Sequence, residues 1–483
     1  MDEKQLGLNS LKINDQQNGK DYYANLKFII GLFVVSVLFS YFSPTPVKYA
    51  FFTGLLLYAY KSNNSPVMLA FFVLLFFPPG YLLNSNDLVG GLPKFSLFGL
   101  RDVTFHEIFI IVVLFKALAI KGKPKIIVPN ALIVYFFTTL LILVFSIIVE
   151  IDLIQMLKSL RYILPITLFF SLSYLFSSKG AIHDFFRYIL PFSAIILLSQ
   201  LFMVLTGLHL SQLFGGNFGV LSAAIDVQEN LARPNYATHL LTLNIAVGFY
   251  LQSLRKNSQS RILRAPWIFS MISIIAIFFT ATRGYALGAV VIVFIYAIIG
   301  KRVKISKLLL SLAILFIILI SISLLSNQIT HSLERLLTVF YLFDGDLSAG
   351  GTLRRLTDYL PEMLEIFYRS PLWGYGFTST FFENSNAHVA FANILLQSGL
   401  IGFLIINAIY ISLILKSISW YLEFKDSFYL LSFAVLTALF LIHSTSYAVF
   451  SYLLGQGNYF ILLIVISFMF YRNRKYTHDP SKN

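Results

Sequence analysis

One arginine interrupts a long apolar run in this sequence. The run IIAIFFTATRGYALGAVVIVF places Arg283 between two predicted membrane-spanning helices, 267–282 and 284–300. A charge at membrane depth is costly and by default marks a functional site, although an arginine at a tight turn can also extend its head to the interface. The guanidinium group can donate two parallel charge-assisted hydrogen bonds to one phosphate. Arg283 is therefore a candidate ligand for a phosphate or pyrophosphate.

Further basic residues are predicted near the same plane. Lys158 and Arg161 stand three residues apart in the predicted span 153–176, which places them on one face of a helix. They could bind an anion or simply extend to the interface. Arg354 and Arg355 lie in the longest predicted outer connection, 327–388. Together these cations predict an anionic ligand held at the lipid surface, such as a lipid-linked phosphate.

The long connection also contains an amphipathic pattern. Apolar residues recur at three- and four-residue spacing, as on a helix lying along the membrane, at Leu353, Leu356, Leu360, Leu364 and Phe367. The opposite face carries the charged residues, which could merely be solvated. Pro361 removes one backbone donor and predicts a kink or two abutting short helices.

His388 ends this connection immediately before an apolar segment. A neutral imidazole can accept a proton from a hydroxyl near neutral pH, although a lone histidine is more often structural. The chain has no cysteine and no HExxH motif. Asp344-Gly345-Asp346 has the DxD spacing of metal-dependent sugar transferases, but two aspartates around a glycine are common in turns.

The elements that must position these residues are predicted from composition. Of 483 residues, 57% are hydrophobic and 12% charged, whereas a soluble domain carries about 25% charged residues. So few charges cannot cover a water-facing surface, and the sequence predicts an all-α polytopic transmembrane bundle of about 12 to 14 spans. The second candidate is short and could form a re-entrant hairpin with its neighbour. The fourteen candidate spans are 26–43, 49–60, 66–83, 105–120, 126–149, 153–176, 184–206, 236–254, 267–282, 284–300, 308–326, 389–415, 427–446 and 456–471.

Lysine and arginine set the predicted orientation, because basic connections stay in the cytoplasm. Most of the 36 basic residues fall in the even-numbered connections and the two tails. The formal charge of +14 is then a signal for membrane orientation, and no nucleic-acid partner is expected. The predicted organisation is a disordered cytoplasmic tail (1–25), eleven transmembrane helices (26–326), a large extracytoplasmic loop with short helices (327–388), three further transmembrane helices (389–471) and a cytoplasmic tail (472–483).

Four stretches resemble the O-antigen ligase and O-antigen polymerase superfamily of bacterial membrane glycosyltransferases. TATRGYALGA (280–289) is similar to an S-R-G segment, with Arg283 as its arginine. TLRRLTDYLPEMLEIFYRSPLWGYGF (352–377) resembles G-R-x-x-x-W followed by P-L-x-G-x-G, with Arg355, Tyr359, Gly374 and Gly376 at the matching positions. AHVAFANILLQSGLIG (387–402) resembles A-H-N-x-x-L…E-x-G-L-I-G, with His388 retained. RPNYATHLL (233–241), with Arg233 and Asn235, resembles N-P-N-x-x-A.

The resemblance implies a metal-independent inverting glycosyltransferase of the bacterial inner membrane, without a cofactor. The donor would be a glycan on undecaprenyl pyrophosphate, and the acceptor a sugar hydroxyl of a glycan or of lipid A–core. Arg283, Arg355, Arg161 and Arg354 would bind the pyrophosphate, and His388 would position or deprotonate the acceptor. Arg233, Asn235, Tyr359, Gly374 and Gly376 would form the acceptor side or shape the loop. Membrane lipids and a chain-length regulator are further candidate partners.

Two choices stay open. A polymerase of O-antigen or exopolysaccharide repeats is preferred, with a ligase acting on lipid A–core as the alternative. A lipid-linked oligosaccharide flippase, which is a transporter, would share the length, the basicity and the span count. Transporters typically show repeated halves and broken helices at the membrane midplane, and the sequence has no clear internal repeat. The missing repeat argues against a transporter, and the large outer loop favours an enzyme.

Overall fold

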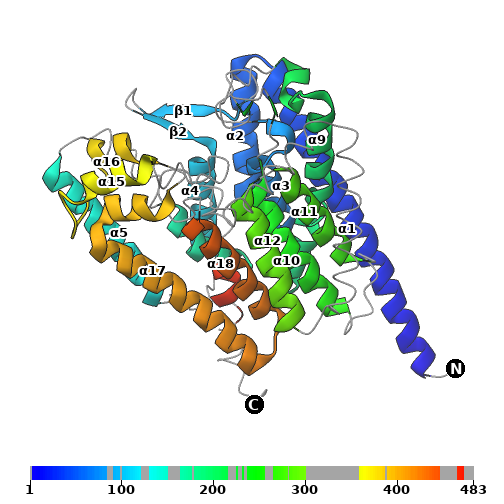
Figure 1. Ribbon diagram of the computed structural model, residues 1–483. Coiled ribbons are helices and arrows are strands. Elements are labelled where there is room, and N and C mark those ends of the chain that lie inside the picture. Colours follow the sequence, from blue (N-terminus) through cyan, green and yellow to red (C-terminus); the bar gives the residue numbers. More distant parts are fainter. Residues whose placement is uncertain are drawn as a thin grey trace.

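The computed structural model forms an all-α membrane bundle with two small antiparallel strand pairs among the residues it describes (Figure 1). Four described helices are long and apolar enough to cross a membrane: Asp21–Phe42, Gly180–Thr206, Ala390–Phe424 and Ser427–Ser444. This confirms the predicted fold class. The structure describes residues 3–83, 91–97, 101–120, 130–150, 164–176, 179–215, 225–226, 231–232, 236–255, 265–280, 282–300, 358–386, 389–445, 465–470 and 472.

Most of the described helices overlap segments predicted as spans. The described helices are α1 (Glu3–Phe42), α2 (Thr45–Lys61), α3 (Ser65–Phe76), α4 (Phe105–Ala119), α5 (Asn130–Val149), α7 (Thr167–Leu175), α8 (Lys179–Ile189), α9 (Phe192–Thr206), α10 (Thr238–Arg255), α11 (Pro266–Phe279), α12 (Arg283–Ile298), α15 (Leu360–Phe367), α16 (Ser379–Asn384), α17 (Ala390–Phe424) and α18 (Ser427–Thr445). Short elements join them: η1 (Pro79–Tyr81), η2 (Leu164–Ile166), η3 (Leu210–Phe214), β1 (Lys94–Leu97), β2 (Arg101–Thr104), β3 (Ile225–Asp226) and β4 (Leu231–Ala232). The predicted span 308–326 and the first part of the long loop, 327–357, lie outside the described residues.

The N-terminal segment differs from the prediction. Residues 1–25 were predicted to be disordered, whereas α1 begins at Glu3 and continues without interruption into the membrane-spanning part. The segment contains no proline, and its lysines, glutamines and leucines favour a helix, although its asparagines, aspartates and two glycines do not. Once the apolar part of α1 has nucleated a helix, adding residues to its end costs little.

The predicted span 184–206 is interrupted at Pro191, between α8 and α9. Proline lacks an N–H, so the carbonyl groups of the preceding turn lose their helical partners. Other helices satisfy two of them: the Tyr22 hydroxyl donates to the Arg187 carbonyl at 3.1 Å, and Asn244 Nδ2 donates to the Ile189 carbonyl at 3.1 Å. A break at membrane depth is tolerated when neighbouring helices supply such bonds.

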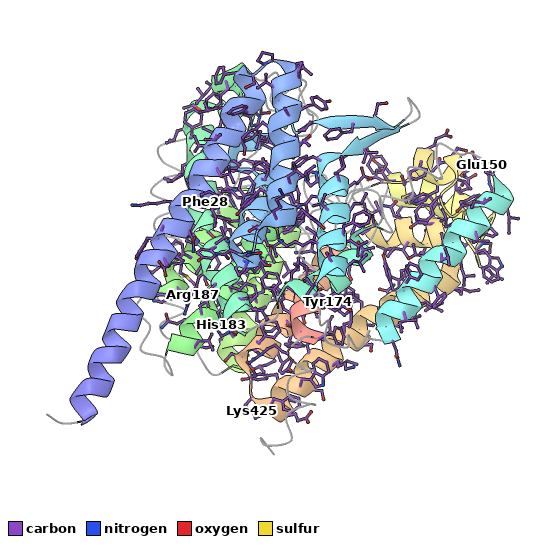
Figure 2. The ribbon with its side chains drawn as sticks, turned by 180° about the vertical axis from the view of Figure 1, so that it is seen from behind. Phe28, Glu150, Tyr174, His183, Arg187 and Lys425 are labelled. Carbon is purple, nitrogen blue, oxygen red and sulfur yellow. The ribbon has the colours of Figure 1, made fainter. Side chains whose placement is uncertain are left out.

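The described elements mark two opposite ends of the molecule (Figure 1). The N-terminal end of α1 and the α17–α18 turn at Lys425 lie at the lower edge of the views, whereas β1, β2, α15 and α16 lie in the upper half (Figures 1 and 2). The strands β1 and β2 pair antiparallel, with Lys94 opposite Thr104. The described part of the long loop is therefore on the side opposite these two basic ends.

Most buried apolar residues form one core shared by α1–α5, α7–α12, α17 and α18. A second, small core lies at the N-terminal end of α17 and holds Met363 of α15, Phe381 of α16 and Leu396 of α17. The end of the long loop thus packs as a unit with the first turns of α17. Helix α5 packs along α17 at one edge of the molecule (Figure 1).

Candidate functional site

Arg283 is the first residue of α12, and α11 ends only a few residues earlier, at Phe279. The direct turn between the two predicted spans is therefore present. The N-cap residue Thr282 makes no side-chain capping bond, and its hydroxyl donates to the Thr280 carbonyl at 3.1 Å. The N-terminus of a helix carries partial positive charge, so α12 adds to the charge of Arg283. Both features favour an anion at this end of α12.

The start of α12 is joined to the start of α10. The Tyr285 hydroxyl lies 2.7 Å from Nδ1 of His239, and the side chain of Tyr285 is fully buried. His239 follows Arg233 and Asn235 closely in the chain. This contact therefore links the TATRGYALGA segment to the RPNYATHLL segment.

Aromatic rings connect this end of α10 to the segments that follow α3 and α9. The ring of Tyr81 packs edge-on against His209 and against Tyr236, each with centroids 4.8 Å apart. The Tyr236 hydroxyl lies 2.6 Å from Ser199 Oγ of α9. Burial lowers the pKa of His209 below its ordinary value of 6.5, so this imidazole is neutral at pH 7.

The loop Pro371–Gly376 packs on a break in α17. The helix is interrupted at Gly399, whose φ of 62° and ψ of −170° are not helical. The loop binds the backbone on both sides of the break: Gly376 N donates to the Gln397 carbonyl at 2.7 Å, and Leu400 N donates to the Pro371 carbonyl at 2.8 Å. Backbone groups that the break would leave unpaired are therefore satisfied by the loop.

Three glycines permit this close packing of backbones. Gly374, Gly376 and Gly399 all have positive φ, which side chains disfavour. A Cβ on Gly374 would lie 2.5 Å from Gly399 N, and one on Gly399 would press on the Leu372 carbonyl. Gly374 and Gly376, predicted as acceptor-side or loop residues, have a clear role in shaping the loop.

Helix α5 and the residue after it bind the backbone just after this loop. Ser146 Oγ accepts a hydrogen bond from Phe377 N at 2.7 Å, and Glu150 Oε2 accepts one from Ser379 N at 2.8 Å. Glu150 lies at the end of α5 beside α15 and α16 (Figure 2). Neither residue was singled out from the sequence, since a serine in an apolar helix and an acid at its end are ordinary features.

Two hydrogen bonds join Asn386, just before α17, to the side chain of Asn393 in α17. Asn386 N donates to Asn393 Oδ1 at 2.9 Å, and Asn393 Nδ2 donates to the Asn386 carbonyl at 2.6 Å. Val389 N also donates to the Asn386 carbonyl, at 3.0 Å. Asn393 is fully buried. These bonds hold residues 386 and 389, which flank His388 in the sequence.

Of the other residues singled out from the sequence, Tyr359 and Pro361 are described by the structure and several are not. Tyr359 lies at the N-cap of α15 and is 46% exposed, with no capping bond from its side chain. Residues 358 and 359 are π-helical and run directly into α15, where Pro361 is the second residue, so two helical segments abut beside the proline as predicted. Lying outside the described residues are His388, Arg355, Arg354, Arg161, Lys158, Arg233 and Asn235.

Residues 268–406 match the family model described as O-antigen ligase. The resemblance to the O-antigen ligase and polymerase superfamily is confirmed. The O-antigen ligase segment begins in α11 and ends in α17, so it contains Arg283, the loop Pro371–Gly376 and the break at Gly399. RPNYATHLL lies before it. No curated protein matches the chain. The chain is thus a membrane protein with a segment typical of a family of glycosyltransferase-like enzymes.

Proposed function

We propose that the chain transfers a glycan from undecaprenyl pyrophosphate to an acceptor sugar hydroxyl on the outer face of the bacterial inner membrane. The O-antigen ligase match over residues 268–406 carries the proposal. It is supported by Arg283 at the N-terminus of α12 and by the outer loop packed on α17.

The donor pyrophosphate would bind where positive charge is concentrated. Arg283 and the α12 terminus supply part of that charge, and Arg355, Arg354 and Arg161 are proposed to complete it. As the bond between the anomeric carbon and the phosphate oxygen breaks, its electron pair moves onto the pyrophosphate. Fixed cations that stabilise such developing charge are often the largest catalytic contribution.

The acceptor would approach from the opposite face of the sugar and so invert the anomeric carbon. Its hydroxyl oxygen forms the new glycosidic bond, and its proton passes to the imidazole of His388. Hydrogen bonds between the Asn386 backbone and the Asn393 side chain fix the chain two residues before His388. We propose a polymerase of O-antigen or exopolysaccharide repeats, with transfer to lipid A–core as the alternative.

The test uses a host that lacks this gene and whose surface glycan is separated by chain length on a gel. The host is complemented with wild type, Arg283→Ala, Arg355→Ala or His388→Ala. If wild type restores a ladder where the host has single repeats on core, the protein is a polymerase. If the host has no glycan on core but holds long lipid-linked chains, it is a ligase.

The matched control is Arg369→Ala. Arg369 lies in the same outer loop, but its exposed side chain pairs with Glu365 at 3.2 Å, and it has no proposed role in the reaction. We expect this variant to behave as wild type. If the three site variants also do so at equal membrane expression, the proposed site is wrong.

A further inference from the structure

A row of exposed apolar side chains marks the lipid-facing side of α17. The residues Leu400, Leu404, Ile411, Leu415 and Leu422 are between 44% and 60% exposed. Their spacing of four and seven residues places them on one face of the helix. Because α17 is long and apolar enough to cross a membrane, this face contacts lipid tails.

The row continues onto the outer loop at the break in α17. Leu400 N and Ile401 N donate to the carbonyl groups of Pro371 and Leu372, at 2.8 and 3.4 Å. The side chains of Leu372 and Trp373 are 52% and 59% exposed. The N-terminal end of the lipid-facing row is therefore hydrogen-bonded, backbone to backbone, to the loop segment that carries Leu372 and Trp373.

Tyr368, at the end of α15, adds a third large exposed side chain and is 70% exposed. We name Tyr368, Leu372 and Trp373 the outer aromatic edge. The neighbouring residues Arg369 and Glu365 form an exposed ion pair, so charge lies directly beside the edge. Tryptophan and tyrosine concentrate at membrane–water interfaces, where an apolar ring and a polar atom are both satisfied.

We infer that the outer aromatic edge lies in the headgroup layer of the leaflet on the side of the long loop, with Trp373 as its anchor. The partner is the lipid surface itself. The loop is bound to α17 on both sides of Gly399, so a fixed depth for Trp373 fixes the depth of the whole Pro371–Gly376 loop. If the proposed function holds, this places the outer loop at the level of the lipid-linked phosphates.

The test measures the fluorescence of Trp373 in vesicles. The chain has three tryptophans, so the full-length protein carrying Trp267→Phe and Trp420→Phe reports on Trp373 alone. It is reconstituted with phosphatidylcholine brominated either near the headgroup or near the end of the acyl chain. We expect strong quenching by the bromine near the headgroup, weaker quenching by the deep bromine, and weak quenching by aqueous iodide.

A variant that retains only Trp420 is the matched control, because this ring is 8% exposed and is expected to resist both quenchers. If the two substitutions impair folding, the difference between wild type and Trp373→Phe gives the same quantity. Strong quenching by iodide with none by brominated lipid would overturn the inference. Protection of Trp373 from iodide by added glycan would then assign the edge to sugar binding. Neither result depends on transferase activity, so failure here is distinguishable from failure of the proposed function.

Discussion

The hydroxyl of Tyr285 lies 2.7 Å from Nδ1 of His239, and this contact joins the first turn of α12 to the first turn of α10. Arg283 stands two residues before Tyr285 on the same turn. A shift of α12 relative to α10 would therefore move the cation that is proposed to bind the pyrophosphate. The contact is a candidate device for positioning Arg283.

Replacing Tyr285 with phenylalanine is expected to lower transfer activity more than stability. Removing the hydroxyl takes this partner from a buried histidine nitrogen, which costs about 1–3 kcal/mol of folding free energy and would leave most of the protein folded. The measurements are the thermal unfolding midpoint in detergent and the glycan ladder of complemented cells. Tyr296→Phe is the matched control, since Tyr296 lies further along α12 and donates to the Ala246 carbonyl of α10. Equal activity of the two variants would contradict a positioning role for Tyr285.

Replacing Gly399 with alanine is expected to destabilise the outer loop severely. With φ 62° and ψ −170°, Gly399 is in a backbone region that is essentially restricted to glycine and costs other residues about 1–3 kcal/mol, and the new Cβ would also press on the Leu372 carbonyl. The loop would detach from the break in α17, which limited proteolysis of the folded protein would reveal. Gly54→Ala is the control, because Gly54 lies inside α2 with nothing within 4 Å of its Cβ position. If both variants resist protease equally, the loop does not depend on Gly399.

Replacing Ser146 with alanine removes the acceptor for Phe377 N. A buried donor left without a partner costs about 1–3 kcal/mol, so the unfolding midpoint should fall and the loop should separate more readily from α5. Ser173→Ala provides the comparison, since the Ser173 hydroxyl donates to the Phe169 carbonyl of its own helix. The prediction fails if Ser146→Ala loses no more stability than Ser173→Ala.

Stability is expected to fall with acid partly through His209. Its folded-state pKa lies below the ordinary 6.5, so below that pH the unfolded chain binds the proton more readily than the folded chain. Well above pH 6.5 both forms are neutral and the residue contributes no pH dependence. His209→Phe keeps a ring against Tyr81 and should flatten the loss of unfolding midpoint between about pH 7 and about pH 5. Parallel curves for the variant and wild type would exclude this role.

The sequence determined the membrane character and most helix positions, because hydropathy and charge act over short stretches of chain. The turn at Arg283 followed from a charge inside an apolar run, and Gly374 and Gly376 were recognised by residue type and spacing. The break at Pro191 and the helical segment 3–25 were missed. The break persists because Tyr22 and Asn244 bind the freed carbonyl groups, and no local pattern reports those partners.

Only the tertiary structure decided what surrounds the site. Ser146 and Phe377 are 231 residues apart in the chain, and Glu150 and Ser379 are 229 apart. The pairing of Tyr285 with His239 likewise depends on how α12 packs against α10. Gly374 and Gly376 act on their own backbone, so a local motif could single them out, whereas the break at Pro191 depends on partners from other helices. A buried serine or asparagine becomes important only when packing brings it a partner, and this is why the sequence predicted the loop but not the residues that hold it.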